Sequence, residues 1–434
     1  MAVNVETLGT LERRVTMAVP LEEIERKVDA RLKKLARDVK MAGFRPGKVP
    51  LKLVAQQYGP QVRSEVLGDA VQSAFSDAMK EANLRVAGYP KIEKKDGADE
   101  TALEFSATFE VYPEVKPGDV AAATIERPQV SVDDAAVDKT IEVLRKQRIR
   151  YLPAARAAQA GDRVTVDFEG QIDGTPFAGG KATGFAIILG EKRMLPEFEA
   201  AATGMTAGET KTFELRFPDD YQGKEVAGKT AQFTLTVNEV GAPELPAVDA
   251  EFAKTLGVAD GDLEKMRAEI RANVEREVKK RVDARVKQQA LQALVESTPL
   301  EVPKSLVELE ARQLVERAAA DLQSRGLKIE KMPFDPSAFE GAAKRRVTLG
   351  LIIAELARAE GLQPKPAQVR TLVEQEAQSY ESPAEVVRWF YMQPERLSEM
   401  EGLALESNVV EWVLAKANVS DKPMAFEELM GAAE

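Results

Sequence analysis

The sequence predicts a multidomain α+β protein with an α+β N-terminal domain, a β-rich middle domain and an all-α C-terminal domain. Its 434 residues exceed what one ordinary hydrophobic core accommodates. Strand-like runs with glycine-rich turns are concentrated in residues 161–240, and prolines separate a series of helical patterns after residue 246. We therefore expect domains at residues 1–113, 151–245 and 246–434, with a linker that contains one helix at residues 114–150.

The N-terminal domain reads as two strands and two helices. Apolar residues alternate in residues 11–19 and 103–111, which predicts half-buried strands. Residues 20–39 begin with a proline and continue with apolar residues three to four apart, which predicts a helix. A second helix is predicted from about residue 61 to residue 81.

Helix signals continue through the rest of the chain. Ser131 with Asp134 has the spacing of a capping box and predicts a helix start in the linker. Residues 263–286 carry an apolar stripe spaced by four, which winds around a helix of 3.6 residues per turn. Gly361 is expected to end a helix as its C-cap.

Composition excludes many kinds of site. The chain has no histidine and no cysteine, which excludes disulfides, thiolate nucleophiles, Ser-His triads and the usual zinc sites. If the chain is an enzyme, we expect no proton shuttle, cofactor or metal. No apolar run approaches the about 20 residues of a membrane span, and the first residues do not resemble a secretory signal. We therefore expect a cytoplasmic protein without a membrane partner.

Residues 26–52 are a basic island in an acidic chain. They hold ten lysines and arginines and two aspartates, a net charge of +8 against −11 for the whole chain. Such an island fits an anionic partner, because binding to phosphates releases counterions. Its tip, Gly43-Phe44-Arg45-Pro46-Gly47-Lys48-Val49-Pro50, predicts an exposed loop that presents Phe44 and Arg45 for stacking and phosphate contact. A simple solvated basic helix and turn is the alternative.

The tip resembles the ribosome-docking signature of the trigger factor family, Gly-Phe-Arg-x-Gly-x-x-Pro. Pro46 departs from the family pattern, where a lysine is common. The resemblance implies docking beside the nascent-chain tunnel exit, on a ribosomal protein and adjacent rRNA. The residues implied are Gly43, Phe44, Arg45, Pro46, Gly47 and Lys48.

The middle segment concentrates aromatic residues, with seven of the 16 phenylalanines in residues 161–240. Composition alone favours a plain aromatic core. The order of the motifs, however, resembles FKBP-type peptidyl-prolyl isomerases, with a strand-turn-Phe opening at 161–177, a short helix at 194–199 and a flap at 217–221. The resemblance implies an FKBP-like antiparallel β-sheet with a short helix. The implied catalytic pocket comprises Phe168, Phe177, Phe185, Met194, Leu195, Phe198, Tyr221 and Phe233.

Tyr221 would be the polar group near the substrate carbonyl. Phe198 stands where many FKBPs place tryptophan, and Ala178 stands where they usually carry aspartate. Isomerisation of an X–Pro bond faces a barrier of about 20 kcal/mol from amide resonance and makes no new bond. An apolar pocket can therefore catalyse it without histidine, cysteine or metal.

The trigger factor resemblance covers nearly the whole chain and implies helical arms in the C-terminal domain, where a closed bundle is the alternative. Adaptable side chains there would suit varied clients: Met266, Met332, Met392, Leu397 and Met400. The resemblance implies a chaperone that is partly ribosome-bound, binds nascent and unfolded polypeptides and isomerises X–Pro bonds. It also implies roles in protein folding, export and cell division, and a homodimer off the ribosome. The alternative is a stand-alone FKBP-type isomerase with helical dimerisation modules.

Overall fold

A computed structural model describes residues 5–41, 44, 48–95, 101–221, 223, 225–326, 335–378, 380 and 382–431. The chain divides into two compact units. The first combines residues 1–127 with 284–422, and the second combines 128–283 with 423–434. The boundary between them falls within helix α6 (Leu263–Ser297). None of the helices in these described ranges combines the length and hydropathy that a membrane span needs.

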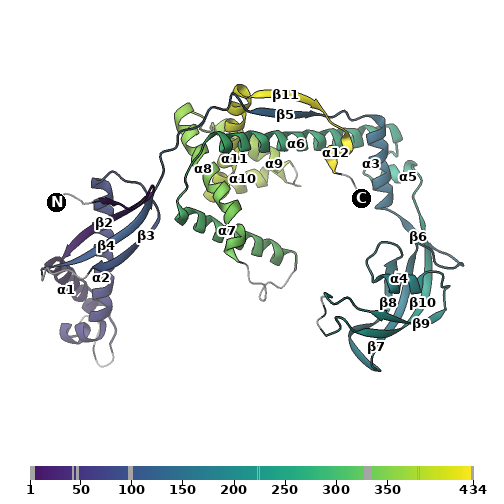
Figure 1. The fold of residues 1–434 in the computed structure, drawn as a ribbon, viewed down its shortest axis with the longest axis horizontal. Coiled ribbons are helices and arrows are strands. Elements are labelled where there is room, and N and C mark those ends of the chain that lie inside the picture. Colours follow the sequence, from purple (N-terminus) through teal and green to yellow (C-terminus); the bar gives the residue numbers. More distant parts are fainter. Residues whose placement is uncertain are drawn as a thin grey trace. The chain divides into compact units, whose positions relative to one another are not determined.

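The first unit begins with a four-stranded antiparallel sheet and two helices (Figure 1). The strands are β1 (Val5–Thr7), β2 (Glu12–Pro20), β3 (Val86–Lys95) and β4 (Ala102–Val111), in the order β1-β2-β4-β3. Helices α1 (Leu21–Asp38) and α2 (Leu51–Glu81) share one core with the sheet. Alternate residues of β2 and β4 are buried, which confirms the predicted half-buried strands.

Helix α2 begins at Leu51, so the predicted start near residue 61 is wrong. The helix runs through Pro60, which lacks an N–H donor and would usually end it at a cost of roughly 3 kcal/mol. Val54 is fully buried and Val62 is 4% exposed, and both belong to the same core. Packing on both sides of the proline therefore offsets the lost backbone hydrogen bond.

A carboxylate from the sheet caps helix α7 (Lys304–Ser324). Glu110 on β4 accepts hydrogen bonds from the backbone N–H groups of Lys304 and Ser305, at 2.9 and 2.7 Å. Ser305 Oγ donates to the carbonyl of Ala87 on β3 at 2.9 Å. Burial raises the pKa of Glu110, but the hydrogen bonds from Ser305 and Lys304 outweigh burial and lower it. The sheet thus satisfies N–H groups that the helix itself leaves unpaired.

The rest of the first unit is mainly helical. It contains η1 (Pro336–Phe339), α8 (Glu340–Glu360), α9 (Pro366–Ala377), α10 (Pro383–Met392) and α11 (Pro394–Lys416). Gly361 ends α8 with a φ of 68°, which confirms the predicted left-handed C-cap. Strand β11 (Asn418–Pro423), which the sequence does not predict, pairs with β5 (Thr124–Gln129). Gln289 on α6 exchanges two hydrogen bonds with the backbone of Glu126 on β5, at 2.9 and 2.8 Å.

The second unit has a helical part and a β-sheet part. The helical part contains α3 (Asp134–Lys146), α5 (Ala250–Thr255), the start of α6 and α12 (Phe426–Met430). The apolar stripe of α6 is buried here from Met266 to Val278, whereas Leu263 at its start is 37% exposed. Asp133, and not Ser131, caps α3, because its carboxylate lies next to the first turn and accepts from the Ala136 N–H at 2.9 Å.

The β-sheet part is a five-stranded antiparallel sheet with one short helix (Figure 1). Its strands are β6 (Arg150–Pro153), β7 (Arg163–Ile172), β8 (Thr175–Ile188), β9 (Thr210–Arg216) and β10 (Thr230–Glu244). The order is β6-β10-β7-β8, and β9 also pairs with β10. The short helix α4 (Pro196–Ala202) buries Phe198 in a core shared with the sheet.

Candidate functional site

An aromatic cleft of about 390 Å³ opens in the β-sheet part of the second unit. Strands β7, β8, β9 and β10, helix α4 and the connecting loops all contribute to its lining. The cleft brings together seven of the eight residues predicted for an isomerase pocket. They are Phe168, Phe177, Met194, Leu195, Phe198, Tyr221 and Phe233.

Phe185, the eighth predicted residue, lies beside the cleft and not in its lining. Its side chain is 41% exposed, and its ring packs edge-on against Phe168 with centroids 5.8 Å apart. A register shift between β7 and β8 separates Val166, which pairs with Phe185, from Phe168. Alternation along the sequence does not reveal such a shift, because it assumes one unbroken register.

The cleft also has lining residues that the predicted pocket omits. Apolar members are Ala178, Gly179, Leu215, Phe217, Gly223 and Val226, and charged members are Lys192 and Arg193. Phe217 directly precedes Pro218, and this dipeptide at a strand end is the sequence signal that could have identified it. The loop that holds Lys192 and Arg193 offers no comparable signal.

The aromatic rings form one continuous contact network. Phe233 lies at its centre and contacts five other rings, among them Phe198 at a centroid distance of 5.9 Å. Phe198 in turn packs edge-on against Phe168 at 5.3 Å. Phe217 continues the network to Tyr221, whose ring centroid is 4.9 Å away. Phe198 is 2% exposed, whereas Tyr221 is 40% exposed. The network therefore runs from a buried floor to an accessible rim.

Gly170 on β7 allows the Phe233 ring to pack against the strand in the cleft floor. It pairs with Phe233 across β7 and β10, and the Phe233 ring lies over it. A Cβ atom at position 170 would lie 2.5 Å from Phe233 Cε1, well inside van der Waals contact. The absence of a side chain at this position is what allows the ring to lie against the strand.

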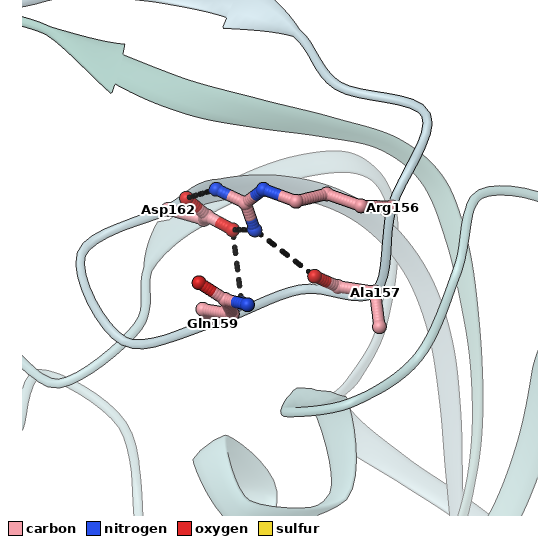
Figure 2. A network of polar contacts seen from close by, with 4 residues as sticks. All are labelled: Arg156, Ala157, Gln159 and Asp162. Carbon is pink, nitrogen blue, oxygen red and sulfur yellow. Dashed lines mark hydrogen bonds and ion pairs between the residues drawn. The ribbon is translucent and has the colours of Figure 1, made fainter.

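An ion pair with a buried carboxylate fixes the segment that precedes β7 (Figure 2). The Arg156 guanidinium donates to both carboxylate oxygens of Asp162, at 2.6 and 2.9 Å, and to the Ala157 carbonyl at 3.0 Å. The Gln159 N–H donates to the same carboxylate at 2.9 Å. These donors, Arg156 first, hold the pKa of Asp162 below its usual value even though the residue is only 1% exposed.

The chemistry available in the cleft is binding and desolvation. Among its described lining residues the charged groups are Lys192 and Arg193, and no carboxylate is present. Arg193 is ion-paired with Glu191 at 2.9 Å. Tyr221 supplies a hydroxyl at the rim. Elsewhere, too, the described ranges contain no group of three acidic residues that could hold a metal.

The predicted docking loop is only partly described. Gly43, Arg45, Pro46 and Gly47 lie outside the described residues. The Phe44 side chain is 38% exposed, and its N–H donates to the Met41 carbonyl at 3.1 Å. Lys48 is exposed, whereas the next residue, Val49, is 7% exposed and belongs to the core of the sheet and helices. Buried Val49 thus anchors the chain immediately after exposed Lys48.

The methionines expected to contact clients differ in exposure. Met266 is 1% exposed within the core of α3 and α6, so its expected role as a contact surface is wrong. Its position on the apolar stripe accounts for this burial. Met392 is 82% exposed at the end of α10, while Met332 lies outside the described residues.

Three family models match the chain in succession. Residues 1–144 match a model described as bacterial trigger factor protein, and residues 262–415 match the trigger factor C-terminus. Between them, residues 154–238 match FKBP-type peptidyl-prolyl cis-trans isomerase.

Full-length relatives are similar throughout. The trigger factor of Aromatoleum aromaticum is 55% identical over 433 residues, covering 100% of both chains. That of an Azoarcus species is 56% identical over 423 residues, covering 98% of this chain and 97% of the relative. A solved structure titled for promiscuous substrate recognition by the trigger factor chaperone covers 95% of this chain and 99% of its own, at 20% identity and a TM-score of 0.47.

These matches confirm the resemblance in the sequence and disfavour a stand-alone isomerase, because trigger factor models flank the isomerase model on both sides. The FKBP-type domain makes the protein a peptidyl-prolyl cis-trans isomerase. The chain therefore belongs to the trigger factor family of chaperones.

Proposed function

We propose that this trigger factor isomerises X–Pro bonds in the aromatic cleft while the basic loop of its N-terminal domain docks on the ribosome. The proposed functional domains are residues 1–113 for docking, 151–245 for isomerisation and 246–434 for binding client chains, joined by the linker at 114–150. The single observation that carries the proposal is the cleft, whose buried aromatic floor leads to an exposed tyrosine at the rim.

The cleft fits the physical demands of prolyl isomerisation. The transition state is a twisted amide that has lost its resonance, and a dry apolar surface favours it over the planar, solvated amide. Phe198 and Phe233 provide such a surface, because they are 2% and 5% exposed. The Tyr221 hydroxyl, on a side chain that is 40% exposed, can reach a substrate carbonyl at the rim. No proton has to move in this reaction.

Ribosome docking rests on charge and exposure. The net charge of +8 in residues 26–52 suits rRNA, and exposed Phe44 suits stacking or an apolar contact with a ribosomal protein. We place the protein in the cytoplasm, partly bound at the tunnel exit, with nascent and unfolded polypeptides as clients. Exposed apolar residues of α10, such as Trp389 and Met392, suit such clients. A homodimer away from the ribosome is part of the same proposal.

A proline-limited refolding assay tests the isomerase site in the full-length chain. The wild type is expected to accelerate refolding, and Phe198→Ala is expected to lose most of that acceleration. Since Phe198→Ala also leaves a cavity, Tyr221→Ala serves as a second variant, because its side chain is 40% exposed and its loss leaves the core intact. Full acceleration by both variants would contradict the cleft as the reaction site.

A further inference from the structure

One wall of the cleft has almost no regular secondary structure of its own. The wall loop, residues 190–195, connects the end of β8 to the start of α4 and supplies four lining residues, Lys192 to Leu195. It pairs with no strand. Its backbone N–H groups therefore depend on partners outside a sheet or helix, and the shape of the wall depends on those partners.

Glu199 is the partner at both ends of the wall loop. One carboxylate oxygen, Oε2, accepts from the Gly190 N–H at 3.0 Å. The other, Oε1, accepts from the Met194 N–H at 3.4 Å. A single side chain thus bridges the residue where the loop leaves the sheet and a residue that lines the cleft. Among the described residues, no other acidic side chain is hydrogen-bonded to these two N–H groups.

The bridge supports an uncommon backbone conformation. Lys192, at the middle of the loop, has a φ of 55°, whereas the φ of 92° at Gly190 is one that glycine adopts without strain. A left-handed lysine is uncommon and persists only where its surroundings hold it. The Glu199 bridge encloses Lys192, since Gly190 and Met194 flank it on both sides. This arrangement fixes the turn that directs Met194 and Leu195 to the cleft.

Glu199 is itself placed by the floor of the cleft. It follows Phe198 directly on α4, and Phe198 is 2% exposed within the aromatic network. The base of the loop is also held, because the Leu189 N–H donates to the Asp162 carbonyl at 3.0 Å and the Gly161 N–H donates to the Leu189 carbonyl at 2.7 Å. The segment of Figure 2 therefore provides a fixed frame on which the wall loop is mounted.

We infer that Glu199 is a positioning residue for prolyl isomerisation, which acts by holding the wall loop against the cleft through the Gly190 and Met194 N–H groups. It touches no reacting atom. This inference rests on the proposed function, because it takes the cleft as the reaction site. The expected kinetic consequence is loss of substrate binding, since a displaced wall removes contact surface from the ground state and the transition state alike.

Glu199→Gln in the full-length chain tests this role. Glutamine keeps the size of the side chain but offers one acceptor and one donor group, so it cannot accept from both N–H groups. We expect KM for a proline tetrapeptide to rise about tenfold while kcat changes by less than about twofold. Glu197→Gln is the matched control, because Glu197 is exposed on the same helix and is expected to leave both constants unchanged.

The split between KM and kcat separates positioning from folding. A variant that merely unfolds a fraction of the domain lowers apparent kcat and leaves KM unchanged, and that result would overturn the inference. Amide hydrogen exchange supplies a measurement that does not depend on turnover. Protection of the Gly190 and Met194 N–H groups in the wild type, lost in Glu199→Gln, supports the bridge, whereas unprotected amides in the wild type would overturn it.

Phe198→Ala, measured beside Glu199→Gln, distinguishes a failure of the Glu199 positioning role from a failure of the cleft as the reaction site. If Phe198→Ala lowers kcat/KM and Glu199→Gln leaves KM unchanged, the cleft stands and the positioning role fails. If Phe198→Ala and Tyr221→Ala both keep full activity, the cleft itself is not the reaction site and the positioning role fails with it.

Discussion

Arg156 and Asp162 form a two-pronged ion pair in which the carboxylate is 1% exposed and both of its oxygens accept from one guanidinium. The pair lies in the segment before β7. That segment is hydrogen-bonded to the chain on both sides of α4, the helix that carries Phe198 in the cleft floor. The Ala158 N–H donates to the Met205 carbonyl at 2.8 Å, after α4, and the Leu189 N–H donates to the Asp162 carbonyl, before it. Loss of the pair therefore affects more than one surface loop.

We expect Asp162→Asn to destabilise the β-sheet domain by about 2 kcal/mol, because it removes the buried carboxylate charge that accepts both guanidinium hydrogen bonds, while the Arg156 side chain is 39% exposed and can be solvated. Urea unfolding, followed through amide signals of β7 and β10, measures the loss. Glu169→Gln is the control, since Glu169 pairs with Lys181 on the exposed surface and such pairs add little. Equal stability of both variants would contradict a structural role for the pair.

The same pair predicts how stability depends on pH. The folded pKa of Asp162 is lowered, mainly by the hydrogen bond from Arg156, relative to about 3.9 in an unfolded chain. Its contribution is therefore fully present above the unfolded value and decreases as the pH falls through the folded pKa. We expect the wild-type domain to lose stability below about pH 4. Asp162→Asn should show a shallower slope in that range.

Tyr221→Phe isolates the hydroxyl at the rim of the cleft. We expect kcat/KM for a proline peptide to fall about tenfold, the effect of losing one hydrogen bond of about 1.4 kcal/mol to the transition state. The melting temperature should not change, because the side chain is 40% exposed and its ring is retained. Tyr151→Phe, on β6 outside the cleft lining, is the control. Unchanged kcat/KM would assign catalysis to the aromatic surface alone.

Glu110→Gln tests the cap that the first sheet provides to α7. Glutamine keeps one acceptor, so one of the two N–H groups of Lys304 and Ser305 loses its partner. We expect a loss of about 1 kcal/mol in the stability of the first unit. Faster hydrogen exchange should appear first at these two amides. Glu104→Gln on the same strand is the control. The Glu104 carboxylate makes a long ion pair with Lys95 Nζ, at 4.0 Å, so this variant should behave as the wild type.

Ribosome pelleting across a salt series tests docking. Lys48→Ala should reduce the slope of log affinity against log salt by about 0.7 to 0.9, the value for one lost phosphate contact. Phe44→Ala should weaken binding at every salt concentration with little change in slope, because the ring carries no charge. Lys116→Ala and Leu8→Ala are matched controls, exposed residues of the same unit. Intact binding after changing Phe44 together with Arg45 would refute the docking proposal.

Local sequence patterns predict those helices and strands whose signal lies within the element itself. The alternation in residues 11–19 predicts β2, and the prolines predict the starts of α9, α10 and α11. The early start of α2 and strands such as β3 and β11 escape prediction, because each depends on a partner elsewhere in the chain. Pro60 is tolerated through core packing, and β11 exists through pairing with β5.

The same distinction applies to the candidate site. Aromatic residues in family-like motifs locate most of the cleft lining, since their type and order carry the signal. Glu199 escapes such reasoning, because its bridge to Gly190 and Met194 depends on how the loop turns back over α4. Phe185 lies beside the cleft for a related reason, a register shift that no alternation pattern records.

The pairing of β5 with β11 determines when this two-stranded sheet can form during synthesis of the chain. β5 leaves the ribosome early and β11 comes close to the end of the chain, so the edge of β5 stays open while most of the sequence is translated. At about 5–20 residues per second this takes tens of seconds, and an open strand edge invites pairing with foreign strands. A copy that terminates before Asn418 would keep that edge open permanently, which favours aggregation.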